Sequence, residues 1–175
     1  MAEHALADRD EKTLLLAITV AEETGDLTAR ANCYEAAGRY YYFVADNDRA
    51  RQFYDEALTI YNNTGDENGQ GKAYSGMAEI LFRRGRNSEA LAHHDKALTL
   101  FVKTGNIAGQ SLVYLKQGRI MYFMDEYGRA LELFDKAIPL LEKAKDISGL
   151  GEAYLNKGIL FFYQGRIDET AALLD

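Results

Sequence analysis

Apolar and small residues return along this chain with a period of 40 positions. Within each period they recur at spacings of three and four, which place side chains on one face of an α-helix. No stretch combines the strict apolar–polar alternation of a half-buried strand with hairpin turn signals at its ends. The pattern therefore predicts an all-α protein built from one repeated unit.

The repeat is visible when the sequence is shifted by 40, because four units then align without a gap. One column is always tyrosine, and three others hold small residues that would let helices approach closely. The columns are Tyr34, Tyr74, Tyr114 and Tyr154; Gly38, Ala78, Gly118 and Gly158; Ala50, Ala90, Ala130 and Thr170; and Ala57, Ala97 and Ala137. A gapless match over four units indicates a repeat array rather than chance similarity.

Each unit reads as two helices, which we call helix A and helix B. The pairs that join successive units are Gly25-Asp26, Gly65-Asp66, Gly105-Asn106 and Lys145-Asp146. The glycine can take the left-handed conformation that ends a helix, and the Asp or Asn can cap the next one. In the second unit we expect helix A to run to about Arg84, Gly85 to end it, and helix B to run from about Asn87 to about Lys103.

The whole chain is interpreted as a single solenoid, residues 1–175. We divide it into a partial N-terminal repeat at 1–23, full repeats at 24–63, 64–103 and 104–143, and a truncated repeat at 144–175. Residues 9–23 have the pattern of a helix B, and the residues before them, including His4, are expected to fray. The apolar ending at Leu173 and Leu174 favours a piece of a longer array, with atypical end caps as the alternative.

These columns resemble the tetratricopeptide repeat over nearly the whole chain. The third unit carries the pattern as Tyr114, Gly118, Met121, Ala130, Phe134 and Ala137. The period of 40 exceeds the usual 34 and resembles a long-helix subclass that includes Pins-type adaptors, kinesin light chains and bacterial response-regulator phosphatases. The resemblance implies a right-handed α-α superhelix of antiparallel helix pairs. HEAT repeats share the period, but their Pro, Asp and Arg pattern is missing.

The resemblance also implies a peptide-binding groove lined by the A helices. The first unit would contribute Asn32, Glu35, Arg39, Tyr42 and Phe43, and the second would contribute Lys72, Ser75, Glu79, Phe82 and Arg83. The third would contribute Leu112, Leu115, Arg119, Tyr122 and Phe123, and the fourth Glu152, Leu155, Ile159, Phe162 and Tyr163.

Two interpretations of the groove residues stay open at this stage. The aromatic column at 42, 82, 122 and 162 either packs successive A helices or forms a ladder for apolar side chains of a ligand. Arg39, Arg83 and Arg119 either contact an acidic ligand or pair with neighbours such as Glu35 and Glu79. The Lys and Asn clamp of co-chaperone receptors is not present at the matching positions, so a chaperone tail is not the expected ligand.

Three other residues invite a chemical role, and for each the sequence favours a structural one. His93 and His94 are adjacent, so on a helix they point in different directions and are poorly placed to share a metal ion. His94 replaces a core aromatic and is expected to be packed. Cys33 shares a column with Ala73 and Ala153 and is expected to be buried and inert.

Pro139 falls inside the third helix B and should kink it.

Composition narrows the classes of function. The net charge of -7 makes a general nucleic-acid binder improbable on electrostatic grounds. There is no apolar run long enough to span a membrane and no signal-peptide pattern at the start. A single cysteine fits a reducing, cytoplasmic setting. No catalytic constellation, cofactor motif or metal-ligand spacing is found, so we expect neither an enzyme nor a cofactor.

We therefore expect a non-catalytic module that binds a protein or peptide of unknown identity in its groove, without nucleic acid or membrane. One alternative is a sensor or regulatory segment of a larger bacterial signalling or transcription-regulating protein. Another is a self-assembling scaffold, for instance a homodimer formed through the solenoid ends.

Overall fold

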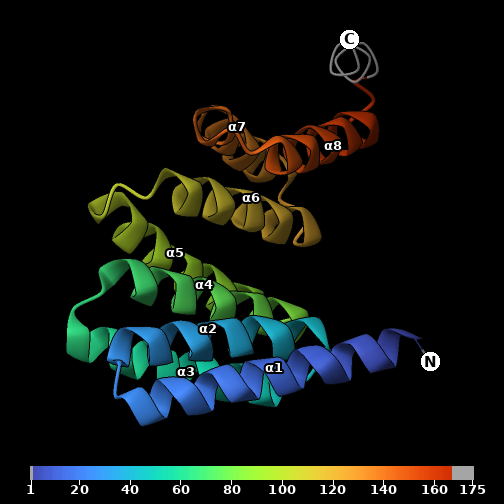
Figure 1. Ribbon diagram of the computed structural model, residues 1–175. Helices are drawn as coiled ribbons and strands as arrows, with labels where there is room; N and C mark the ends of the chain where they lie inside the picture. Colours follow the sequence, from blue (N-terminus) through green and yellow to red (C-terminus); the bar gives the residue numbers. More distant parts are fainter. Residues whose placement is uncertain (1, 167–175) are drawn as a thin grey trace. The chain divides into compact units, whose positions relative to one another are not determined.

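The structure is a computed structural model that describes residues 2–166, with side-chain surroundings from residue 11 onward. The described residues form eight α-helices and no strand, as the periodicity predicts (Figure 1). The helices are α1 (Ala2–Thr24), α2 (Leu27–Phe43), α3 (Asn47–Thr64), α4 (Glu67–Arg83), α5 (Asn87–Lys103), α6 (Ile107–Phe123), α7 (Tyr127–Ala144) and α8 (Ile147–Tyr163). The expectations about Thr170, Leu173 and Leu174 lie outside the described residues.

The helix boundaries agree closely with those expected from the sequence, except at the start of the chain. Helices α4 and α5 end at Arg83 and Lys103, within one residue of the predicted ends. Helix α1 begins at Ala2, so the prediction that the residues around His4 fray was wrong. Ala2, Ala5 and Ala7 lie there, and alanine has the highest helix propensity.

The polar residues between repeats cap the A helices as predicted. The side chains of Asp66, Asn106 and Asp146 each accept a hydrogen bond from a backbone N–H three residues later, at 2.9, 2.8 and 2.9 Å. Asp26 accepts from the N–H groups of Thr28 and Ala29. These bonds satisfy N–H groups of the first turn that have no partner within the helix.

Each helix A ends in the same turn, whose central residue has a positive φ. Gly85 and Gly165 occupy it with φ of 72° and 70°, while Ala45 and Asp125 occupy it with φ of 64° and 61°. In the repeat at residues 24–63 the Asp46 N–H donates to the Tyr41 carbonyl and the Ala45 N–H donates to the Tyr42 carbonyl. This pair of bonds defines a Schellman motif, and it recurs at the end of helix A in each of the other three repeats.

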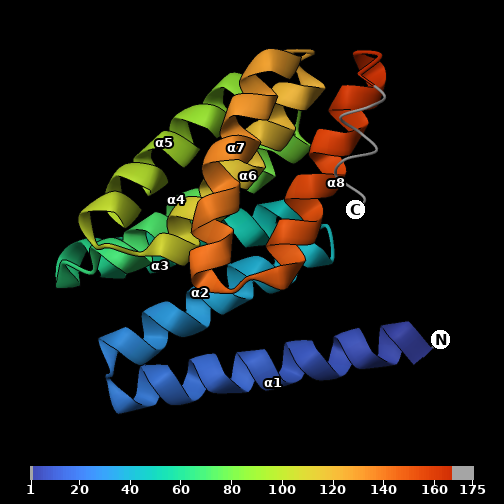
Figure 2. The ribbon, with the colours of Figure 1, turned by 90° about the horizontal axis from the view of Figure 1, so that it is seen from above.

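The chain folds as two compact units, residues 1–100 and 101–175, with the boundary inside α5. In the first unit α1 packs on α2, α2 on α3 and α3 on α4, and α2 also contacts α4 (Figure 2). In the second unit α6 packs on α7, α7 on α8, and α6 also contacts α8. Successive helices therefore pair as in a helical repeat, and the predicted all-α repeat architecture is confirmed.

The small columns lie where aromatic rings pack against helix A. Ala50, Ala57, Ala90, Ala97, Ala130 and Ala137 are all fully buried. A Cβ added at Gly118 would lie 2.6 Å from the Phe134 ring, and one at Gly38 would lie 2.8 Å from the Tyr54 ring. These glycines let a helix-B aromatic approach the helix-A backbone, which explains why the repeat tolerates glycine inside a helix.

Two core predictions have different outcomes. His94 is fully buried in the column of Tyr54 and Phe134, which confirms its packing role, and its Nε2 lies 3.5 Å from Glu79 Oε1. Cys33 is only half-buried, so the prediction that it is buried was wrong. Ala73, the equivalent residue on α4, is fully buried, and the packed helices α2 and α3 precede it. Cys33 lies on α2, which is preceded by α1.

Helix α7 continues through Pro139, which it holds in its interior. At the equivalent positions Thr59 and Thr99 donate their hydroxyls to the carbonyls of Asp55 and Asp95. Proline cannot make the backbone bond to residue 135, and its ring occupies space near that carbonyl. The kink at this position stays a prediction.

Candidate interaction surfaces

In the second unit the structure brings four predicted groove residues together at the ends of α6 and α8. The ring centroids of Tyr122 and Phe123 lie 5.6 Å apart, those of Tyr122 and Tyr163 6.5 Å, and those of Phe162 and Tyr163 6.2 Å. Tyr127, at the start of α7, lies 6.0 Å from Tyr122. We call these five residues the aromatic cluster.

The aromatic cluster is largely open to solvent. Phe123, Phe162 and Tyr163 are 63%, 68% and 64% exposed. Leu155 and Ile159, further back along α8, are also exposed, so the apolar surface continues along that helix. Large aromatic side chains grouped on a surface are typical of interaction sites, because covering them removes much apolar area from water.

Polar groups of the aromatic cluster are ordered by hydrogen bonds. The Tyr127 hydroxyl donates to Asp125 Oδ1 at 2.7 Å. Desolvation, followed by a hydrogen bond with Tyr163, raises the pKa of Tyr122 above its ordinary value. The Tyr127 hydroxyl, whose proton is donated to Asp125, can still accept a hydrogen bond from a ligand.

Tyr127 was missed by the sequence analysis, which searched for groove residues on the A helices. It is the first residue of a helix B, in the column of Asn47 and Asn87, where neither equivalent residue is aromatic. The sequence signal for Tyr127 is that an aromatic residue replaces the asparagine found at this helix start in the other two repeats.

Two predicted groove residues are buried, so their assignment as ligand contacts is corrected. Ser75 and Leu115 are 8% and 2% exposed. They belong to the column of Glu35, whose side chain is also mostly buried at 12% exposure. Helices α2 and α4 contact each other, as do α6 and α8, so this column takes part in packing between successive A helices.

Arg83, expected to meet an acidic ligand, is instead engaged within the first unit. Its guanidinium carbon lies 3.6 Å from the centroid of the Tyr42 ring. Its Nη1 donates to the Tyr42 carbonyl at 2.5 Å and to Asn47 Oδ1 at 3.2 Å. The side chain thus ties α4 to α2 and to the start of α3, and it covers one face of Tyr42.

The other charged groove residues of the first unit divide between packing and solvent. Arg39 Nε lies 3.2 Å from Glu35 Oε1, one turn earlier on α2. The Asn32 amide oxygen accepts a hydrogen bond from the Tyr61 hydroxyl at 3.0 Å. Lys72 is exposed, and Glu79 is half-buried beside His94.

The members of the aromatic column differ in exposure. Tyr42, Phe82 and Tyr122 are half-buried, whereas Phe162 is exposed. Phe43 is 84% exposed in the column of Phe123. Arg119 is half-buried, and Leu112 is exposed. The Glu152 carboxylate lies 3.6 Å from the Lys116 amine, which joins α8 to α6.

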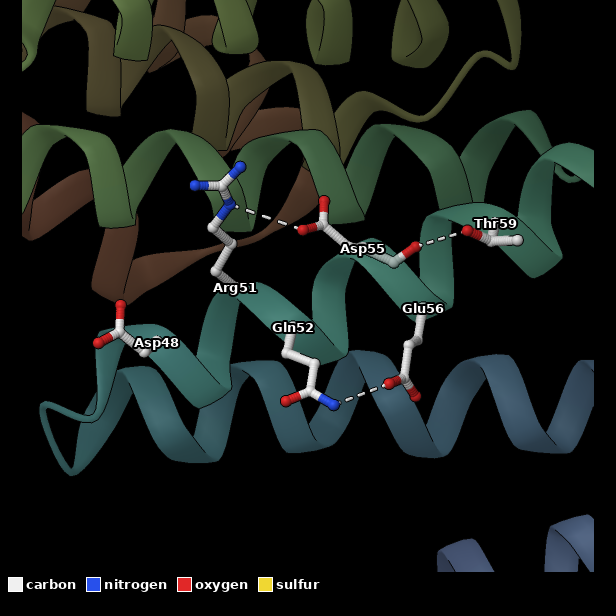
Figure 3. Close-up of a pocket in the computed structure, with 6 residues that line it drawn as sticks. All are labelled: Asp48, Arg51, Gln52, Asp55, Glu56 and Thr59. Carbon is white, nitrogen blue, oxygen red and sulfur yellow. Dashed lines mark hydrogen bonds and ion pairs between the residues drawn. The ribbon is translucent and has the colours of Figure 1, made fainter.

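A shallow hollow of about 380 Å³ lies on the exposed face of α3 (Figure 3). Asp48, Arg51, Gln52, Asp55, Glu56 and Thr59 line it. Gln52 donates to Glu56 at 3.1 Å, and Arg51 lies 3.6 Å from Asp55. All six side chains come from one helix, so this hollow is a helix surface rather than a site assembled by the fold.

Among the side chains that the structure describes, no group of three or more His, Cys, Asp or Glu is placed to hold a metal ion. Within residues 2–166, none of the helices combines the length and apolar character needed to cross a bilayer.

Comparison with known proteins identifies the repeat. Residues 70–143 match the tetratricopeptide repeat family, a range that covers most of α4 through nearly all of α7. No curated protein sequence matches the chain.

Several solved structures share the fold. BtubC (BKLC) from P. vanneervenii has a TM-score of 0.82 at 20% identity, covering 99% of this chain and 72% of that one. Aspartyl phosphate phosphatase F from Bacillus subtilis has a TM-score of 0.85 at 17% identity, covering 93% of this chain and 43% of that one. For a signal transduction ATPase with a tetratricopeptide repeat sensor from Pyrococcus horikoshii the values are 0.79 and 16%, covering 98% and 26%. At these identities the likeness concerns the fold, and this chain spans less than half of the last two proteins.

Proposed function

We propose a function from the tetratricopeptide repeats that the sequence predicts and that residues 70–143 contain. The chain is a non-catalytic protein-interaction module, and the aromatic cluster of its second unit binds apolar side chains of a protein or peptide partner. The observation that carries the proposal is the exposure of Phe123, Phe162 and Tyr163, whose rings are linked through Tyr122.

The energetics favour such a partner. Aromatic side chains dominate the binding energy of many interfaces, because each buries a large area at a small cost in side-chain entropy. In the aromatic cluster the rings already contact one another through Tyr122. Prior ordering of the rings limits the entropy lost on binding, so most of the ordering cost falls on the partner.

The test compares the capture of partners from a lysate of the source organism by the parent chain and by variants. The Phe123→Ala/Phe162→Ala variant should lose the partner, while Phe43→Ala should retain it. Phe43 is the matched control, since it occupies the column of Phe123 and is even more exposed. Circular dichroism would confirm that all three chains are equally helical. Equal capture by all three would reject the aromatic cluster as the binding surface.

A second candidate function is supported by the comparisons. One similar structure contains a tetratricopeptide repeat sensor, and this chain covers only 26% of that protein. A sensor or regulatory segment of a larger bacterial protein would use the same surface to detect its partner. A native reading frame that continues past residue 175 into an output domain would support this function, and a native stop codon there would count against it.

A further inference from the structure

The aromatic cluster has a counterpart in the first unit, because the period of 40 relates two sets of positions. Adding 80 to the numbers of Tyr42, Asn47 and Arg83 gives Tyr122, Tyr127 and Tyr163. Each set takes one residue from the end of a helix A, one from the start of the following helix B and one from the end of the next helix A. The two sets therefore show what the same arrangement of helix ends holds when its side chains differ.

In the first unit this arrangement holds a guanidinium group. The Arg83 guanidinium carbon lies 3.6 Å from the centroid of the Tyr42 ring, which places the cation on the face of the ring. Arg83 Nη1 also donates hydrogen bonds to the Tyr42 carbonyl and to Asn47 Oδ1. An arginine therefore fits these helix ends when the chain itself supplies it.

In the second unit Tyr163 takes the position of the arginine, and the ring faces are only partly covered. The plane of the Tyr163 ring is tilted by 42° from that of Tyr122, and the plane of the Tyr127 ring by 38°. Tilted rings leave part of each face open, unlike the stacked pair of Tyr41 and Phe53, whose planes differ by 1°. The face of an aromatic ring has a negative electrostatic potential, which attracts cations.

A carboxylate lies next to the aromatic cluster, at a position where the first unit has none. Asp125 is exposed, and its Oδ1 accepts a hydrogen bond from the Tyr127 hydroxyl at 2.7 Å. The corresponding residue of the first unit is Ala45. The hydroxyl is neutral, so it orients the carboxylate without cancelling its charge. Through this bond Asp125 raises the pKa of Tyr127 above its ordinary value, as a negative charge next to a phenol should.

The charges around the aromatic cluster favour a cation over a purely apolar group. Glu126 follows Asp125, is also exposed, and makes no capping hydrogen bond with its side chain. Arg166, just after α8, lies on a different ring, with its guanidinium carbon 4.3 Å from the centroid of Phe161. A purely apolar ligand would take the Asp125 carboxylate out of water without giving it a partner, which costs free energy. The net charge of -7 adds to the attraction for a cationic segment.

Of the cationic side chains, arginine suits this surface best. Its guanidinium group is planar, so it can stack on a ring, and its N–H groups can bind a carboxylate through two parallel hydrogen bonds. It is also more weakly hydrated than an ammonium group, so covering it costs less. The contact of Arg83 with Tyr42 shows the stacking part of this arrangement within the chain itself.

We propose that the segment bound by the aromatic cluster carries an arginine, whose guanidinium group lies against the rings of Tyr122 and Tyr163 and pairs with Asp125. Apolar side chains of the same segment cover Phe123 and Phe162. The inference rests on the proposed function, since it names the chemistry of the ligand for that same site. The second unit thus takes from a partner the kind of cation that the first unit supplies to Tyr42 internally.

The test titrates two peptides with blocked ends into the full isotope-labelled chain and follows the backbone amide signals. One peptide has leucine, arginine and leucine between two glycines. The other has citrulline in place of arginine, which is planar and of nearly the same size but uncharged. The signals of residues 122–127 and 162–163 should shift at peptide concentrations up to about 5 mM, as expected for a millimolar complex. The arginine peptide should bind at least about threefold more tightly than the citrulline peptide, because the rings and Asp125 attract the cation.

Asp125→Asn tests the carboxylate, and asparagine tolerates the left-handed backbone of this residue, whose φ is 61°. It should weaken binding of the arginine peptide about threefold and change binding of the citrulline peptide less than about twofold. The matched control is Asp95→Asn, which removes the same charge from an exposed position on α5 and should change either affinity less than about twofold. Thermal unfolding of both variants would show that a loss of binding is not a loss of folding.

Equal binding of the two peptides would overturn the inference and leave the proposed function standing, because both peptides keep their leucines. Equal effects of Asp125→Asn and Asp95→Asn, or shifts that avoid residues 122–127 and 162–163, would overturn the inference as well. The proposed function fails on a different result, which is equal capture from the lysate by the parent chain and by the Phe123→Ala/Phe162→Ala variant.

Discussion

At the scale of single residues, Ala45 and Asp125 occupy a backbone position that glycine fills in the other two turns. Their φ values of 64° and 61° lie in the left-handed region, where a Cβ crowds the following carbonyl. An L-residue with a side chain is strained there by about 1–2 kcal/mol. The repeat therefore retains local strain at two of its four turns.

We expect Ala45→Gly to raise the free energy of unfolding by about 0.5–1 kcal/mol, since relief of strain exceeds the entropy gained by the unfolded chain. Urea denaturation measures the change. Gly85→Ala, at the same turn of the next unit, should lower stability and serves as the converse control. A loss of stability in Ala45→Gly would show that the turn does not strain alanine.

Tyrosines with raised pKa values link stability to alkaline pH, and Tyr34 and Tyr61 are two of them. Burial, reinforced by a hydrogen bond to Glu22, raises the pKa of Tyr34 to about 12, and burial next to Glu35 and Asp66 raises that of Tyr61 to about 12. The unfolded chain titrates near the ordinary value of about 10. Between these values the folded state binds more protons than the unfolded state, so stability falls as the pH rises.

We expect the free energy of unfolding to be unchanged just below pH 10 and to decline from there to about pH 12. Denaturant unfolding over this range, with tyrosinate absorbance recorded in parallel, checks the direction. Tyr61→Phe cannot ionise and should show a smaller decline than the parent chain. An identical decline in both would assign the effect to other groups.

At the scale of helices, what a glycine allows depends on the side chain packed against it. A Cβ at Gly118 on α6 would lie 2.6 Å from Phe134 on α7, whereas one at Gly128 on α7 would meet no atom of the described residues within 4 Å. Both glycines lie in helices, and the packing partner decides what each position tolerates.

We expect Gly118→Ala to destabilise the chain by about 1–3 kcal/mol through overpacking. Gly128→Ala should stabilise it by up to about 1 kcal/mol, because alanine has the higher helix propensity and meets no clash among the described residues. The two variants carry the same substitution, and their thermal unfolding measures the difference. A loss of stability in Gly128→Ala as large as that in Gly118→Ala would contradict this description of α7.

At the scale of the whole molecule, exposed apolar side chains on α1 bear on association. Leu15, Leu16 and Val20 are 43%, 64% and 49% exposed on that helix. Contiguous apolar surface of this kind is a common interaction site. The net charge of -7 opposes contact between copies, and this repulsion weakens as salt is added.

We expect the sedimentation coefficient of the chain to rise with protein concentration, and more steeply at high salt. Leu16→Lys/Val20→Lys should abolish the rise, since it places charge in the centre of the apolar surface. Val102→Lys is the control, because Val102 is 57% exposed on α5, away from α1 in sequence. A parent chain that remains monomeric at all concentrations would exclude self-association through this face.

The sequence by itself determined the helices, their order and their caps. The Asp and Asn caps and the glycines at turns are local signals, and each acts on residues within one helical turn of itself. The core positions of Ala57, Ala97 and His94 also followed, because the same column is buried in successive repeats.

Only the tertiary structure decided which surface residues are available to a partner. Phe82 and Phe162 share a column, yet one is half-buried and the other exposed. Arg83 packs on Tyr42 from a different helix, and the aromatic cluster joins residues of α6, α7 and α8. Exposure and pairing depend on which helices lie next to a side chain, and a repeat pattern describes what its units share rather than where their neighbours differ.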